Sequence, residues 1–112
     1  MATIVDVESL RLSATAARFE GRDHGSPVSL FITAHPPGAE VPLHRHPYVE
    51  TFVVQEGHAG FSVDGATIEA QPGQIVVVPA GAAHGFRSLG ESDLRLVSVH
   101  PSDHVQQEWL EA

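Results

Sequence analysis

Three amino-acid types are missing from this chain of 112 residues, which has no cysteine, no lysine and no asparagine. The absence of cysteine excludes a disulfide framework, a thiolate nucleophile and a cysteine-ligated zinc finger. Without lysine there is no Schiff-base chemistry and no phosphate-loop lysine. Without asparagine there is no N-glycosylation sequon. Any chemistry that this protein performs must therefore use other side chains.

Positive charge is also scarce, because 6 basic residues stand against 14 acidic ones and give a formal net charge of −8. This charge balance argues against nucleic acid and against an anionic membrane as a partner, since both require a basic patch. No apolar run approaches the roughly 18 residues of a membrane span. Residues 1–6 lack the basic and apolar regions of a signal peptide. We therefore expect one cytoplasmic domain over residues 1–112.

Glycine and proline, in contrast, are frequent and scattered, with 10 and 8 copies. Such spacing is typical of many short strands joined by turns. The chain reads as strands over residues 18–20, 28–34, 51–55, 59–63, 66–70, 75–78 and 94–99. Asp64-Gly65 between two alternating runs is a strong hairpin signal. The pattern predicts an all-β fold, an antiparallel sandwich or barrel.

Three segments lead to more specific expectations. Residues 10–17 are rich in alanine, and propensity favours a helix there. Residues 75–78 are four consecutive apolar β-formers, which predicts a strand buried on both faces. Ser102 or Asp103 could cap a short C-terminal helix on which Val105 and Trp109 share a face.

The chemistry is concentrated between Gly38 and Gly57. His44 and His46 share one face of an extended strand, because side chains two residues apart point the same way. Glu50 has the same parity. In a second segment, a turn around Gly81 can bring His84 in from a neighbouring strand.

These residue types suit a divalent transition metal. Imidazole nitrogens favour Fe, Ni, Cu and Zn, and a carboxylate adds charge and suits Mn. A six-coordinate ion bound by the three histidines and the glutamate would keep two positions free for water, dioxygen or a substrate, and open positions permit catalysis.

The same residues closely resemble the two motifs of the cupin superfamily. The first motif spans residues 38–57 and is matched at Gly38, His44, His46, Glu50 and Gly57. The second spans residues 73–88 and is matched at Gly73, Pro79, Gly81 and His84. Its last position is asparagine in the family and Ser88 here. That asparagine is not a metal ligand, so the departure leaves the expected metal site intact.

The resemblance implies a jelly-roll β-barrel with a metal inside it. The ligands that it implies are His44, His46, Glu50 and His84. The ion would be one divalent transition metal per chain, chosen from Fe, Mn, Ni, Zn, Cu and Co. Small cupins are commonly homodimers, so a homodimer is expected.

Other residues are candidates for the pocket. His100 ends the last strand at the parity of Ser98 and is either a general base or a strand-end residue. Tyr48 lies between metal ligands and either contacts a substrate or sits at the barrel rim. Phe52 and Phe86 are each two residues from a ligand and are expected to line the substrate pocket.

Two classes of function fit these residues. The first is a metal-dependent enzyme that acts on a small oxygenated or aromatic molecule, as a dioxygenase with Fe(II) or as an isomerase, cyclase or lyase with Zn, Mn or Ni. The second is a non-catalytic cupin that binds a sugar or another small effector. The sequence does not choose between them, because one fold hosts many activities.

Overall fold

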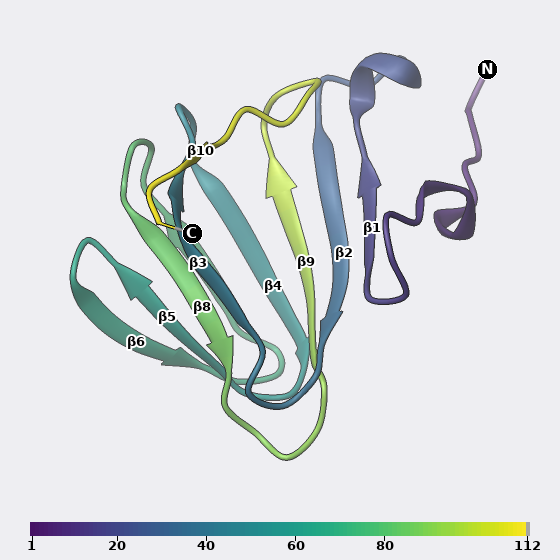
Figure 1. The fold of residues 1–112 in the computed structure, drawn as a ribbon. Helices are drawn as coiled ribbons and strands as arrows, with labels where there is room; N and C mark the ends of the chain where they lie inside the picture. The colour runs from purple at the N-terminus through teal and green to yellow at the C-terminus, as the bar shows by residue number, and fades with distance from the viewer. Residues whose placement is uncertain (112) are drawn as a thin grey trace.

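Two antiparallel sheets of five strands each make up the computed structural model, which describes residues 1–111 (Figure 1). The strands are β1 (Ala16–Phe19), β2 (Ser29–His35), β3 (Glu40–Arg45), β4 (Glu50–Glu56), β5 (Ala59–Val63), β6 (Ala66–Ala70), β7 (Ile75–Val78), β8 (His84–Ser88), β9 (Leu94–His100) and β10 (Glu108–Trp109). Two short 3-10 helices, η1 (Val7–Leu10) and η2 (Gly21–Asp23), complete it. The predicted all-β antiparallel fold is confirmed; Ala112, the last residue of the predicted domain, lies outside the described residues.

The core lies between the two sheets, whose strand orders are β1-β2-β9-β4-β7 and β10-β3-β8-β5-β6. Along β4, Glu50, Phe52 and Val54 are buried while the residues between them are partly exposed. The same period of two runs along β9, so that Leu94 and Leu96 join the apolar core. The inner faces of β4 and β9 thus carry apolar side chains at one end and polar ones at the other.

The hairpin of β5 and β6 is the best-predicted element. Its strands begin and end at the residues expected from the sequence, and Val63 pairs with Ala66 across the turn. Asp64 and Gly65 have φ angles of 47° and 84°. This left-handed pair is what a two-residue hairpin turn of the primed type requires.

The helix expected over residues 10–17 is wrong. Arg11 forms an isolated bridge with Ala17, residues 12–15 are bends, and β1 starts at Ala16 and pairs with β2. Alanine propensity is a weak preference, and pairing with a neighbouring strand overrides it.

The predicted C-terminal helix is wrong for the same reason. Residues 101–104 are bends, and β10 pairs with β3, with Glu108 opposite Arg45 and Trp109 opposite His44. The C-terminal segment, yellow in Figure 1, runs from β9 to the edge of β3. Backbone pairing with the open edge, with an ion pair between Arg45 and Glu108 at 2.9 Å, replaces the expected helical turns.

The burial expected for β7 is also wrong. Val76 and Val78 are buried, but Ile75 and Val77 are 63% and 61% exposed. The core lies between only two sheets, so the inner face of β7 carries Val76 and Val78 into it, while the outer face has no second layer over it among residues 1–111.

None of the helices within residues 1–111 has the length and hydropathy needed to cross a membrane. The cytoplasmic location stays a prediction from the sequence.

A β-bulge in β3 lies directly before His44 and sets the direction in which this side chain points. Val41 pairs with Phe86 and His44 pairs with His84, so three steps along β3 match two along β8. A Cβ atom added at Gly85 would lie 2.5 Å from the Val41 carbonyl oxygen. Only glycine leaves room for the bulged strand to approach this closely.

We predict that Gly85→Ala lowers the free energy of unfolding by about 1–3 kcal/mol, the usual cost of forcing an extra methyl group into a packed site. Urea unfolding followed by circular dichroism measures this change. Gly90→Ala is the matched control, because the nearest heavy atom to its added Cβ is 3.6 Å away. A Gly85→Ala variant as stable as the control would contradict the role given to the bulge.

Candidate metal centre

Four buried side chains from three strands and one turn converge at one end of the space between the sheets. His44 lies in β3, His84 opens β8 opposite it, and Glu50 opens β4. His46 follows β3, and its carbonyl oxygen accepts a hydrogen bond from the Gly81 amide at 2.8 Å. This hydrogen bond links the turn before β8 to the segment that carries His44 and His46. One potential ligand atom from each of the four side chains lies within 4.8 Å of the others.

Each histidine of this group is oriented by a hydrogen bond to a backbone carbonyl. The Nδ1–H group of His44 donates to the Pro42 oxygen at 2.8 Å. The Nδ1 atoms of His46 and His84 make the same bond, at 2.7 Å to Gln106 and 2.9 Å to Ala82. With the proton held on Nδ1, the Nε2 lone pair is free to bind a metal.

The Nε2 atoms of His46 and His84 face the Glu50 carboxylate at short range. Glu50 Oε1 is 2.8 Å from His84 Nε2 and 3.1 Å from His46 Nε2. The His46 contact lacks hydrogen-bonding geometry, and His46 Nε2 is buried without a partner among the described residues. A neutral imidazole that donates from Nδ1 presents only a lone pair here, and so does the carboxylate oxygen. Two acceptors this close require a proton or a cation between them, so the donor set fits a metal ion.

Burial and mutual contact shift the proton affinities of these groups in different directions. Burial lowers the pKa of His44 to about 4. Burial acts against the charge on Glu50, but contacts with the surrounding imidazoles, His100 first, outweigh it and hold the pKa of that carboxyl well below its usual range. Burial also opposes the charge on His84, yet the hydrogen bond to Glu50 raises the pKa of His84 overall. At neutral pH, Glu50 is therefore an anion and His44 is neutral.

His100 holds the second oxygen of Glu50. It is completely buried, and its Nε2 lies 3.1 Å from Glu50 Oε2. The Tyr48 hydroxyl lies 2.6 Å from His100 Nδ1 and accepts a hydrogen bond from the Gln106 amide at 3.2 Å. The Tyr48 hydroxyl then donates to Nδ1, so the Nε2–H group of His100 donates to Ser98 Oγ at 3.2 Å and lies against Glu50 Oε2. This leaves Oε1 facing the other histidines.

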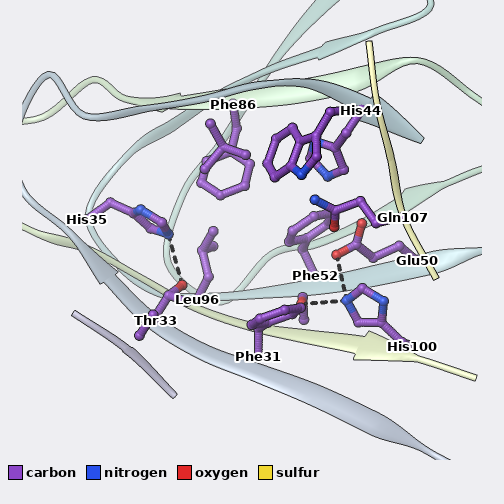
Figure 2. Close-up of a pocket in the computed structure, with 14 residues that line it drawn as sticks. Phe31, Thr33, His35, His44, Glu50, Phe52, Phe86, Leu96, His100 and Gln107 are labelled. Atoms are coloured by element: carbon purple, nitrogen blue, oxygen red, sulfur yellow. Dashed lines mark hydrogen bonds and ion pairs between the residues drawn. The ribbon is translucent and has the colours of Figure 1, made fainter. Parts of the chain in front are cut away.

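A mostly apolar cavity of about 200 Å³ adjoins the cluster. Figure 2 shows His44, Glu50 and His100 on one side of it, with aromatic and aliphatic side chains between them and the other end. The cavity is lined by Ala16, Phe31, Thr33, His35, Val41, His44, Glu50, Phe52, Phe86, Leu96, Ser98, His100, Gln107 and Trp109.

Of the three residues expected in the substrate pocket, two line the cavity and one does not. Phe52 and Phe86 line the cavity, as expected from their distance to the ligands. Tyr48 is not among the lining residues and stands behind His100 instead.

Several lining residues were missed. Phe31, Thr33 and His35 alternate on the inner face of β2, and that alternation was the signal that could have found them. Trp109 reaches the cavity only because β10 pairs with β3, which no local pattern predicts.

This fold and site define a class of protein, the jelly-roll barrels with a three-histidine, one-glutamate cluster. The family model described as Cupin domain matches residues 31–100. The chain belongs to the cupin family, as its two motifs predicted.

The chain matches only part of the length of its curated relatives. The Streptomyces cyaneus protein named polyketide synthase CurC is 37% identical over 62 residues, which cover 54% of this chain and 40% of that protein. The 5-nitrosalicylic acid 1,2-dioxygenase of Bradyrhizobium sp is 33% identical over 64 residues, covering 57% of this chain and 31% of the enzyme. The matched segment thus spans less than half of either relative.

Solved structures share the fold. The oxalate decarboxylase of Lactobacillus farciminis, in a formate complex, superposes with a TM-score of 0.80 over 92% of this chain and 34% of its own, at 22% identity. An oxalate oxidase gives a TM-score of 0.75 over 85% of this chain and 54% of its own, at 18% identity. At such identities the likeness establishes the jelly-roll barrel and no activity.

The pKa directions generate a test on metal-free protein. As the pH is lowered from 8, we expect His84 to take up a proton first, because its pKa is raised, and His44 to stay neutral until the pH approaches about 4. Nitrogen-15 NMR of the imidazoles reports both the protonation state and the tautomer. His44 should carry its proton on Nδ1. Titration of His44 near 6.5, or a proton on its Nε2 alone, would contradict the geometry.

Proposed function

We propose that this chain holds one divalent transition metal through His44, His46, Glu50 and His84 and acts on a small oxygenated or aromatic molecule in the adjoining cavity. The observation that carries the proposal is the common orientation of the three imidazoles. Each is anchored through Nδ1, and each leaves Nε2 for a shared centre beside a charged carboxylate. Such outer hydrogen bonds are typical of metal-binding histidines.

The bound metal would supply Lewis-acid or redox chemistry and coordination positions for oxygen atoms of a substrate. The chain's own residues do the rest. Glu50 brings the negative charge that offsets part of the metal's charge. His100 restrains Glu50 Oε2, so that Oε1 remains for the metal side. Tyr48 fixes the ring of His100 in turn, so we assign both residues a positioning role.

Among reaction types we place a dioxygenase first and an isomerase, cyclase or lyase second. A relative named as a dioxygenase supports the first type. The apolar cavity supports it too, because it can seat an aromatic molecule beside the metal ligands. The chain has neither cysteine nor lysine, so a thiolate nucleophile and a Schiff base are not available to it.

We also propose that residues 1–112 form a single cupin domain and that it pairs as a homodimer. β1 and β10 lie outside the matched family segment, yet they pair with β2 and β3 inside it. The exposed Ile75 and Val77 on the outer face of β7 give an apolar surface that a second copy could cover. Light scattering on the full chain tests the dimer.

Metal binding itself is directly measurable. Purified protein grown with added metal should carry close to one transition-metal ion per chain by elemental analysis. His46→Ala and Glu50→Ala each remove a ligand, so we expect metal affinity to fall by more than about a hundredfold, beyond the usual effect of an outer-shell residue. His100→Leu should lower it by about tenfold.

The control for these variants is His104→Ala, which removes an imidazole whose side chain is 41% exposed and which is outside the cluster. Its metal content should equal that of the wild type. Thermal unfolding monitors whether each variant is folded. Equal metal affinity in the wild type and the folded Glu50→Ala variant would overturn the assignment of the site.

Oxygen consumption separates the enzyme from a binding module. Protein loaded anaerobically with Fe(II) and then given oxygen should consume it with at least one member of a panel of catechols, β-diketones and 2-hydroxy acids. The Glu50→Ala variant should not. Compounds that bind without oxygen uptake or conversion under any of Fe, Mn, Ni or Zn would contradict the enzyme and favour the non-catalytic cupin.

A further inference from the structure

The cavity has a second polar end, away from the metal ligands. On β2 the side chains of Phe31, Thr33 and His35 face inward, because residues two apart share a face of a strand. His35 Nε2 lies 2.9 Å from Thr33 Oγ1. In Figure 2 this pair lies on the opposite side of the cavity from Glu50 and His100, with apolar side chains between them.

The pair is held in place and carries no charge at neutral pH. The ring of His35 packs edge-on against Phe86, with centroids 4.9 Å apart. Burial lowers the pKa of His35, so the imidazole is neutral. The pair is therefore a hydrogen-bonding group and not a cation.

One polar hydrogen of the pair is left over in either tautomer. If His35 donates from Nε2 to Thr33 Oγ1, the Thr33 hydroxyl hydrogen is free. If the Thr33 hydroxyl donates to Nε2, the proton of His35 is on Nδ1 and is free. No other hydrogen bond of either side chain is found among the described residues. The far end of the cavity thus offers a donor for an oxygen atom of a ligand.

The rest of the wall is unfavourable for an anion. Neither arginine nor lysine lines this cavity within residues 1–111, and the one acidic lining residue is Glu50. A carboxylate at the far end would lose its hydration without meeting a positive charge, which is costly. The volume of about 200 Å³ is slightly larger than the apolar cavity of ~150 Å³ that accepts benzene. One substituted ring fits this space.

We propose that the cavity selects an uncharged single-ring aromatic compound, with oxygen donors at the metal end and a neutral oxygen acceptor at the opposite end that Thr33 and His35 recognise. This inference rests on the proposed function, since the metal end is the site assigned above. It names the class of substrate that the site accepts and assigns Thr33 and His35 as specificity-determining residues.

Three catechols that differ only at the ring position opposite one hydroxyl test the proposal. They are 3,4-dihydroxybenzaldehyde with a carbonyl acceptor, 4-methylcatechol with none, and 3,4-dihydroxybenzoate with a negative charge. Binding to the full chain is measured anaerobically by calorimetry at pH 7, with zinc as the loaded metal because zinc has no redox chemistry. The same titrations are run on metal-free protein.

We expect the preference for the aldehyde over 4-methylcatechol to fall about three- to tenfold in the Thr33→Val/His35→Phe variant, the effect of one lost hydrogen bond. The aldehyde also acidifies the catechol, but that effect is equal in both proteins and cancels in the comparison. The benzoate should bind the wild type at least about tenfold more weakly than 4-methylcatechol. Either single variant would still leave one polar hydrogen in the cavity, so Thr33→Val/His35→Leu serves if the first double variant does not fold.

Thr67→Val on the exposed strand β6 is the matched control, and its preference should equal that of the wild type. An aldehyde preference unchanged in the Thr33 variants would overturn the inference. Benzoate binding as tight as that of 4-methylcatechol would also overturn it, and so would the absence of binding by all three compounds. Failure of the metal assignment looks different: affinities would be the same with and without zinc, while the Thr33 variants would still change the aldehyde preference.

Discussion

The buried carboxylate of Glu50, shared among the imidazoles of His46, His84 and His100, is the interaction on which the rest of this structure depends. Burying such a charge without partners costs several kcal/mol or more. The contacts between Glu50 and these rings, at 2.8–3.1 Å, offset that cost. They also join strands from both sheets, because Glu50 and His100 belong to one sheet and His84 to the other. The site is therefore part of what holds the two sheets together.

Local sequence signals predicted the elements that depend on local physics. The Asp64-Gly65 turn determines its hairpin because few other residues adopt the required φ angles. The helices expected over residues 10–17 and near Trp109 were wrong, because short segments of weak propensity took the conformation that pairs with an available strand. The exposure of Ile75 was missed because four consecutive apolar residues do not tell whether one face of a strand is covered or both.

The spacing of residues along the chain predicts that the four metal ligands converge. It does not predict which residues line the cavity. The spacing of the two motifs brought His44, His46, Glu50 and His84 into one group, as expected. Tyr48 was a candidate for substrate contact because it lies between ligands in sequence, with the barrel rim as the alternative, and its hydroxyl instead meets His100. Thr33 and His35 are far from the motifs in sequence. Only the position of β2 beside β9 brings them into the same cavity.

The central claim is that one metal ion is held by Nε2 atoms of three histidines and by one oxygen of Glu50. The most direct measurement is X-ray diffraction from crystals of the metal-loaded protein, with anomalous data collected on both sides of the metal's absorption edge. The account predicts a single anomalous peak about 2.0–2.2 Å from His44 Nε2, His46 Nε2, His84 Nε2 and a Glu50 oxygen. A peak elsewhere, coordination through Nδ1, or no peak in metal-saturated crystals would contradict it.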